Sequence, residues 1–190
     1  MGAVAAITGK FRLGPDNGRV ILRTGRAGLA ARAGHDLTIE ITRWWAQVEV
    51  PEQEAGIAAA TVTAGFDLGS LEVREGTGGA KPLTDRDRAE IKKTISGILG
   101  DGEATFTSSR IIRTGARGGA IEGMLTLAGK TQPLRLEVSQ PGPGRYRGSG
   151  TVVQSAYGIK PYVGFFGALK LRDEIGLEFD VDLTRAESGG

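Results

Sequence analysis

The chain contains no cysteine and only one histidine, His35. The absence of cysteine excludes disulfides, catalytic thiols and thiolate metal sites. With a single imidazole, a zinc site would need carboxylates for its remaining ligands, and no local spacing supplies them. We therefore expect no metal and no other cofactor.

Long apolar runs are also missing, and no segment approaches the ~18 consecutive apolar residues that a membrane-spanning helix needs. The first residues, MGAVAAITGKFRLG, lack the basic segment and sustained apolar stretch of a signal peptide. The expected location is therefore the cytoplasm, or the periplasm or exterior if a leader has been removed.

Neither sign of charge dominates, because 24 Lys and Arg face 22 Asp and Glu. The cations are unevenly spread: residues 10–43 hold seven basic side chains and three acidic ones. A nucleic-acid binder usually concentrates positive charge on a face and adds aromatics that stack on bases. Aromatics make up only 6% of this chain, so no nucleic-acid partner is expected.

What the chain does have is glycine, 31 among its 190 residues, and alternation of apolar with polar side chains. This length favours one domain over residues 1–190. Period-two alternation predicts half-buried antiparallel strands. The predicted strands lie near residues 20–23, 37–41, 44–50, 60–66, 106–112, 121–127, 134–138, 146–153 and 175–183.

One segment breaks the alternation and predicts a helix from Thr84 to Leu99. Thr84 is followed three residues later by Asp87, a capping pattern, and Ile91, Ile95 and Ile98 recur at helical spacing. So many strands with one helix predict a mainly β fold: a closed antiparallel barrel of about eight strands, wide enough for one slender ligand. The isoleucine stripe should pack inward and close one end of the barrel.

Two short motifs carry no catalytic signal. Gly129-Lys130-Thr131 resembles the end of a phosphate loop, but the required upstream glycine is absent and a strand follows, so a hairpin turn is predicted. His35 lies at a strand entrance without a G-x-S-x-G nucleophile elsewhere in the chain. We expect His35 to fix a turn or contact a ligand, and no catalytic residue is assigned.

Aromatic side chains gather in two places. Trp44 and Trp45 are adjacent on a strand and should face opposite sides. Residues 155–170 hold four of the nine Phe and Tyr residues, interleaved with glycines and accompanied by Lys160 and Lys170. This stretch predicts either a packed corner or an aromatic, lysine-edged mouth that admits an apolar chain with an anionic head.

The order of elements resembles the YceI-like family. An early strand, a mid-chain helix, the strand Thr105–Ser109 and the hairpin Gly123–Leu134 match that family's pattern over about residues 11–183, whereas Gly34-His35-Asp36 departs from it and indicates a divergent subgroup. The resemblance implies a bacterial protein with a lipocalin-like barrel that carries a polyisoprenoid or another amphiphilic lipid. Peripheral membrane contact and a homodimer are further expectations.

The expected ligand contacts are aromatic or polar side chains of the barrel and its mouth. They are Arg26, Arg32, His35, Trp44, Phe66, Phe106, Tyr157, Lys160, Tyr162, Phe165 and Phe166. Two alternatives remain open: an enzyme that uses His35 on a lipid-like substrate, and a module that binds protein or nucleic acid through the basic N-terminal stretch.

Overall fold

The computed structural model describes residues 7–52 and 56–189. The strands are β1 (Gly9–Leu13), β2 (Gly18–Arg23), β3 (Arg26–Ala27), β4 (Asp36–Ile41), β5 (Trp44–Val50), β6 (Thr61–Asp67), β7 (Leu71–Thr77), β8 (Glu103–Arg113), β9 (Gly118–Leu127), β10 (Lys130–Gly142), β11 (Arg145–Val153), β12 (Val163–Gly164), β13 (Leu169–Leu171), β14 (Glu174–Asp182) and β15 (Glu187–Gly189). The helix α1 spans Asp85–Leu99, and short 3-10 turns include η1 (Ala31–Ala33), η3 (Leu68–Ser70), η4 (Gln154–Tyr157) and η5 (Phe165–Gly167).

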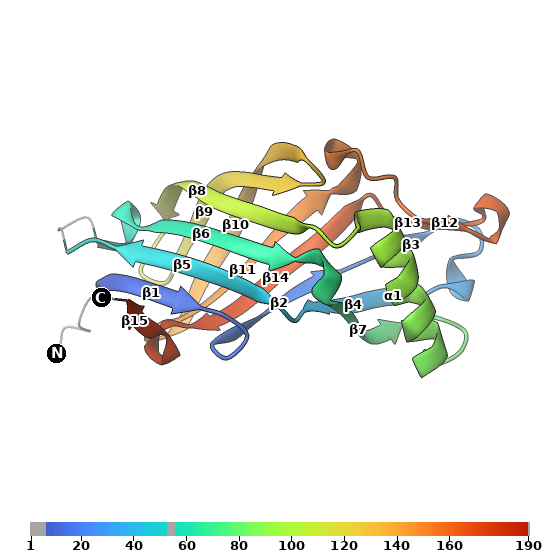
Figure 1. Cartoon of the computed structure of the whole chain (residues 1–190), viewed down its shortest axis with the longest axis horizontal. Coiled ribbons are helices and arrows are strands. Elements are labelled where there is room, and N and C mark those ends of the chain that lie inside the picture. The colour runs from blue at the N-terminus through green and yellow to red at the C-terminus, as the bar shows by residue number, and fades with distance from the viewer. Residues whose placement is uncertain (1–6, 53–55, 190) are drawn as a thin grey trace.

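Twelve of the strands form one antiparallel sheet that curls over on itself (Figure 1). The hydrogen-bonded order is β15-β1-β5-β6-β8-β9-β10-β11-β14-β2-β4-β7. Strands β1, β5, β6 and β8 form the front wall in Figure 1, and β11, β14 and β2 lie behind them. Apolar side chains of both walls meet in one core that includes Val20, Ile39, Trp44 and Phe106.

The closed barrel of about eight strands is therefore wrong, although the mainly β, antiparallel class with one helix is confirmed. The sheet ends at β15 on one side and at β7 on the other, and these two strands do not pair with each other. β2 pairs with β4 instead of with β1, so β4 and β7 extend the sheet as a flap where closure was expected. The result is a curled half-barrel with two free edges.

The apolar residues have odd numbers up to Ile41 and even numbers from Trp44, a reversal for which the sequence suggests a bulge near Arg43 or Trp44. Thr42 and Arg43 leave the strand, and the chain turns a corner between β4 and β5 in place of the bulge that the pattern suggested. The corner is tied to η3, because the Ser70 carbonyl accepts from the Thr42 amide at 3.1 Å and the Ser70 hydroxyl accepts from the Arg43 amide at 2.9 Å. Trp44 then faces the core at 7% exposure while Trp45 is 42% exposed, as predicted.

The predicted helix is confirmed almost to the residue. Thr84 caps it, and its side chain and the Asp87 side chain form a reciprocal capping box. The predicted inward stripe of Ile91, Ile95 and Ile98 is wrong at its last residue. Ile91, Ile95 and Leu99 are partly buried against the core, whereas Ile98 is 43% exposed. No side chain of α1 is fully buried, so the helix rests beside β7 and η3 without plugging the sheet.

Gly129-Lys130-Thr131 is a hairpin turn, as predicted. Ala128 and Gly129 connect β9 to β10 with φ values of 50° and 75°. Two successive residues with positive φ match the twist of a two-residue hairpin. A phosphate loop needs a helix here, and the chain forms a strand.

A second, three-stranded sheet of order β12-β13-β3 lies at the end of the molecule away from both termini (Figure 1). Three loop connections stabilise it, among them the bond from the Ala30 amide to the Ala168 carbonyl at 3.0 Å. Gly28 has φ +93°, and a Cβ there would lie 2.3 Å from the Ala168 carbonyl oxygen. Glycine thus permits the close approach of these two loops.

Candidate functional site

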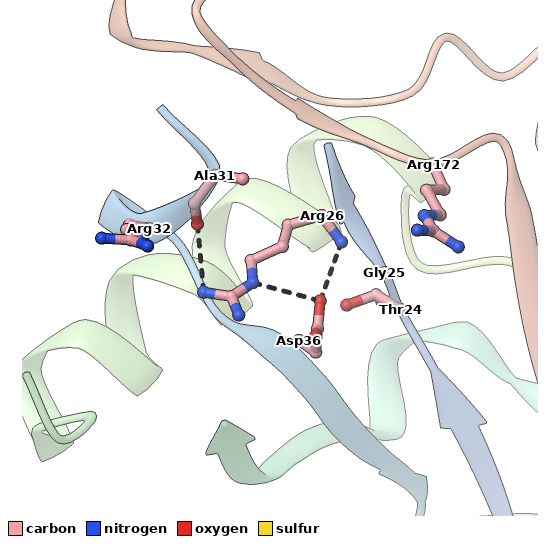
Figure 2. Close-up of a pocket in the computed structure, with 7 residues that line it drawn as sticks. All are labelled: Thr24, Gly25, Arg26, Ala31, Arg32, Asp36 and Arg172. Atoms are coloured by element: carbon pink, nitrogen blue, oxygen red, sulfur yellow. Dashed lines mark hydrogen bonds and ion pairs between the residues drawn. The ribbon is translucent and has the colours of Figure 1, made fainter. Parts of the chain in front are cut away.

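A polar pocket opens where β2 ends and β4 begins. It has a volume of about 470 Å³ and is lined by Thr24, Gly25, Arg26, Ala31, Arg32, Asp36 and Arg172 (Figure 2). Three of these seven residues are arginines and one is an aspartate, so the pocket favours an anionic group.

The Arg26 guanidinium bonds with other groups of the protein. Its Nη1 donates to the carbonyls of Ala31 at 3.0 Å and Gly34 at 2.8 Å, and also to the carbonyl of Gly78. Its Nε lies 3.5 Å from Asp36 Oδ1, which also accepts from the Arg26 amide at 2.8 Å. Arg26 is thus the clamp that joins η1, the start of β4 and the loop after β7.

The two other arginines of the pocket are positioned differently. In Figure 2, Arg32 extends from η1 on one side of Arg26 and Arg172 lies on the other side. The Arg172 amide donates to the Gly25 carbonyl at 2.7 Å, and its Cδ lies where a Cβ on residue 25 would be 2.9 Å away. Sequence reasoning missed Arg172, which precedes the predicted strand 175–183 and belongs to no recognisable motif.

His35 is held by the backbone. Its Nε2 lies 2.7 Å from the carbonyl of Lys81, and the ring packs against Gly79, where a Cβ would come within 2.3 Å of Nε2. Asp36 bonds with Arg26, so its carboxylate is committed away from the imidazole. In the described ranges, no three His, Asp or Glu side chains gather as ligands for a metal.

Three of the aromatic residues expected at the ligand lie on the inner face of the front wall. Trp44 on β5 pairs in register with Phe66 on β6, and Ala64 on β6 pairs with Phe106 on β8. Phe106 is 4% exposed and its ring lies over Gly123, where a Cβ would be 2.5 Å from Cζ. These side chains belong to the core or pack against it, and none of them lines the pocket.

The remaining aromatic and lysine positions follow β11 along the chain. Tyr157 is 4% exposed, and burial raises the pKa of its hydroxyl. Lys160 is exposed, Tyr162 is 39% exposed and Phe166 is 112% exposed. The side chain of Phe165 lies outside the described part of the structure.

The back wall exposes an apolar strip that sequence reasoning did not single out. Its members face inward on adjacent strands and pack against the core, yet each is only partly buried. This inner strip consists of Leu22 (β2), Val138 (β10), Tyr146 (β11), Leu177 and Phe179 (β14). By contrast, the inward residues of β4, Leu37, Ile39 and Ile41, are all buried. The alternation of apolar and polar residues located the strands. It could not show which inward side chains stay partly exposed, because that depends on how the opposite wall covers them.

A second, larger hollow of about 730 Å³ lies along the back wall. Most of its lining residues are polar or charged, and Val138 and Phe179 of the inner strip also border it. It is crossed by ion pairs, including Arg23–Glu178 at 2.8 Å, Arg74–Glu40 at 2.6 Å and Arg147–Asp180 at 2.8 Å. The hydrogen bond to Glu178 raises the pKa of Arg23, and that to Glu40 raises the pKa of Arg74. In the described part of the chain, both hollows are lined mainly by charged or polar residues, and neither is the apolar channel expected inside a barrel.

No helix in the described ranges is long and apolar enough to cross a membrane.

Comparison with solved structures gives the same fold at low sequence identity. Burkholderia cenocepacia BcnA aligns with a TM-score of 0.57 and 19% identity, covering 86% of this chain and 94% of that one. A mutant of the Campylobacter jejuni YCEI protein, solved with a monobromobimane guest, aligns with a TM-score of 0.57 and 13% identity, covering 80% and 85%. No curated protein matches the chain.

The family model described as a YceI-like domain matches residues 27–183, which include β12 and β13, the helix and the whole back wall except β2. The chain therefore belongs to the YceI-like family.

Proposed function

We propose that this protein binds a long apolar amphiphile of the isoprenoid or lipid class along the inner strip. The observation that carries the proposal is the contrast between two inward rows: Leu37, Ile39 and Ile41 on β4 are buried, whereas Leu177 and Phe179 on β14 are only partly covered. Apolar surface left uncovered inside a curled sheet is where a slender chain gains about 0.8 kcal/mol per buried CH₂.

The head group is assigned to the arginine pocket. Leu22, the strip residue on β2, is followed within three residues by Thr24 and Gly25 of the pocket lining. An anionic head there would meet Arg32 and Arg172, and charge-assisted hydrogen bonds are the stronger kind. Arg26 would support the pocket through its carbonyl contacts and leave the other two arginines to the ligand.

Binding without catalysis is part of the proposal. The His35 imidazole is bonded to the Lys81 carbonyl, and the carboxylate whose charge interacts with it, Asp87, accepts from the Thr84 amide and hydroxyl in the helix cap. Glu40 and Glu72 both bond with Arg74. General-base catalysis needs the imidazole within reach of a nucleophile or water that a third group orients. These bonds argue against the alternative enzyme reading.

The test compares two tryptophan substitutions on one strand. Leu22→Trp fills the inner strip, and Ile21→Trp places the same ring on the outer face of β2. Binding of a polyprenyl phosphate is measured by titration calorimetry, with thermal unfolding as the check on folding. We expect Leu22→Trp to lose binding and Ile21→Trp to retain it. Equal binding by both folded variants would contradict the inner strip as the site.

A further inference from the structure

The end of the molecule farthest from the termini exposes apolar side chains that a water-soluble surface rarely shows. Leu29 is 102% exposed and Phe166 is 112% exposed, and Val163 and Tyr162 follow at 53% and 39%. Leu29 precedes Ala30, whose amide bonds to the Ala168 carbonyl two residues after Phe166. Both side chains therefore project from two loops that are joined to each other. We call residues 28–33 and 162–168 the apolar tip.

Phe166 has an energetically unfavourable backbone conformation. Its φ of 54° and ψ of 33° lie in the left-handed region, which is a genuine outlier for a bulky side chain. Glycine follows at position 167 and would adopt such a conformation freely. A phenylalanine held in this conformation and exposed to solvent gains nothing from the core, which favours an external contact as its purpose.

The charge around the apolar tip has one sign. Residues 24–35 and 155–172 contain Arg26, Arg32, Lys160, Lys170 and Arg172 and no acidic residue. Arg26 pairs with Asp36, but in the part of the chain that the structure describes none of the other four cations forms an ion pair. The nearby Asp173 carboxylate accepts from the Ser155 amide at 2.8 Å and bonds with the Ser155 hydroxyl.

We propose that the apolar tip docks on an anionic lipid bilayer, with Leu29 and Phe166 entering the acyl boundary and Arg32, Lys160 and Lys170 resting on the headgroups. Exposed aromatic and aliphatic side chains surrounded by cations are what an interfacial membrane contact requires. The outer face of the back wall is instead crossed by ion pairs, among them Arg23–Glu178 and Arg147–Asp180. This docking goes beyond ligand binding inside the sheet and does not depend on it.

The experiment uses cosedimentation with vesicles of phosphatidylcholine alone and of phosphatidylcholine mixed with phosphatidylglycerol. The wild type should bind the anionic vesicles and bind the neutral ones much less. Leu29→Ser with Phe166→Ser should abolish sedimentation, and Arg32→Gln with Lys170→Gln should weaken it about 30-fold, since each cation near an anionic surface contributes a several-fold factor. Met124→Ser and Arg113→Gln with Arg117→Gln are matched controls elsewhere on the surface and should behave as the wild type.

Because the chain has no cysteine, a single cysteine can report the depth of insertion. An environment-sensitive fluorophore on Phe166→Cys should shift to the blue with anionic vesicles, while the same label on Ala116→Cys, in the exposed loop between β8 and β9, should not. Equal shifts at both positions, or unchanged sedimentation of the serine variants, would overturn the proposal.

Two outcomes separate this proposal from others. Leu22→Trp, which tests interior binding, should still sediment with anionic vesicles, so the two proposals fail independently. A wild type that ignores vesicles but self-associates, until Leu29→Ser with Phe166→Ser makes it monomeric, would replace the bilayer with a second copy of the chain.

Discussion

Arg26 illustrates how one side chain can organise a site without being free to bind. Its side chain is 17% exposed, and its Nη1 donates to three backbone carbonyls, of which that of Ala31 also accepts from the Gly34 amide. These carbonyls belong to η1, to the residue before His35 and to the loop after β7. Loss of the guanidinium would therefore loosen every segment that lines the pocket.

We predict that Arg26→Ala lowers the free energy of unfolding by about 2–3 kcal/mol, because it removes the side-chain donor of the partly buried Gly34 carbonyl and the ion-pair partner of the Asp36 carboxylate. Arg32→Ala, at an exposed position of the same pocket, should change stability by less than about 0.5 kcal/mol. Urea unfolding of both variants is the measurement. Equal stability would show that the clamp is dispensable.

For the ligand head, Arg32→Ala with Arg172→Ala should weaken an anionic amphiphile about tenfold more than its neutral analogue, since charge-assisted bonds are lost only with the former. Titration of both ligands into wild type and variant measures the difference. If the two ligands lose the same factor, the cations act through folding.

His35→Gln should leave turnover absent and ligand affinity within about threefold of wild type, because the ring bonds to a backbone carbonyl that an amide can also reach. The measurement is lipid binding across pH together with product analysis after long incubation. Wild-type turnover that His35→Gln loses while still binding lipid would establish an enzyme.

At the scale of the element, the stability of α1 depends on the capping box in its first turn and on the partly buried side chains Ile91, Ile95 and Leu99. Hydrogen bonds from the Thr84 hydroxyl and amide lower the pKa of Asp87 from its ordinary 3.8. The folded state thus favours the carboxylate, so this contribution to stability is present above pH 3.8 and is lost as the pH falls through the folded pKa.

The expected result is that Asp87→Asn removes this acid-dependent step. Chemical unfolding on either side of pH 3.8 should show a smaller loss of stability for Asp87→Asn than for the wild type. Asp85→Asn, on the same turn but outside the capping box, is the control and should resemble the wild type. Parallel pH profiles for Asp87→Asn and the wild type would contradict the role of the box.

The inward stripe of α1 can be tested by a matched pair. Ile95→Asp should cost about 1–2 kcal/mol, since a partly buried methyl cluster is replaced by a charge, and Ile98→Asp should cost less than about 0.5 kcal/mol because Ile98 is on the exposed side. Thermal unfolding distinguishes them. A small effect at both positions would make the helix peripheral to stability.

At the scale of the whole molecule, ligand and fold should be linked. A ligand that binds only the folded protein stabilises it by about 2.7 kcal/mol at a free concentration of 100 Kd. We predict that extraction of copurified lipid lowers the melting temperature and that adding back a polyprenyl phosphate restores it. Mass spectrometry of the extract identifies the native ligand. An unchanged melting temperature after complete extraction would argue against occupancy of the inner strip.

Local rules recovered most elements from the sequence. Alternation located the long strands, and the Thr84–Asp87 spacing fixed the start of the helix. The strand from Leu71 to Thr77 was missed because its second half, Arg74-Glu75-Gly76, is polar and a register shift interrupts its pairing with β4. The failure of closure could not be predicted, because strand order is set by long-range pairing that no local pattern encodes.

The candidate site was predicted less completely than the fold. Residue type suggested Arg26, Arg32, Lys160 and the aromatics, and the structure brings Arg26 and Arg32 into one pocket while leaving Trp44, Phe66 and Phe106 in the core. Arg172 and the inner strip escaped notice, because the exposure of an inward side chain depends on what the opposite wall provides. Similarly, nothing in the sequence around Leu29 indicates that its side chain is exposed, because that depends on the rest of the protein leaving the loop uncovered.

The adjacent tryptophans on opposite faces of β5 have a spectroscopic consequence. Trp44 lies in the apolar core and should emit at short wavelength, while Trp45 faces solvent, with its indole N–H donating to Glu103 at 3.0 Å, and should emit to the red. An aqueous quencher will reach only the second. Phenylalanine at one position at a time therefore turns the protein's own fluorescence into two separate reporters, one of events inside the sheet and one of its outer surface.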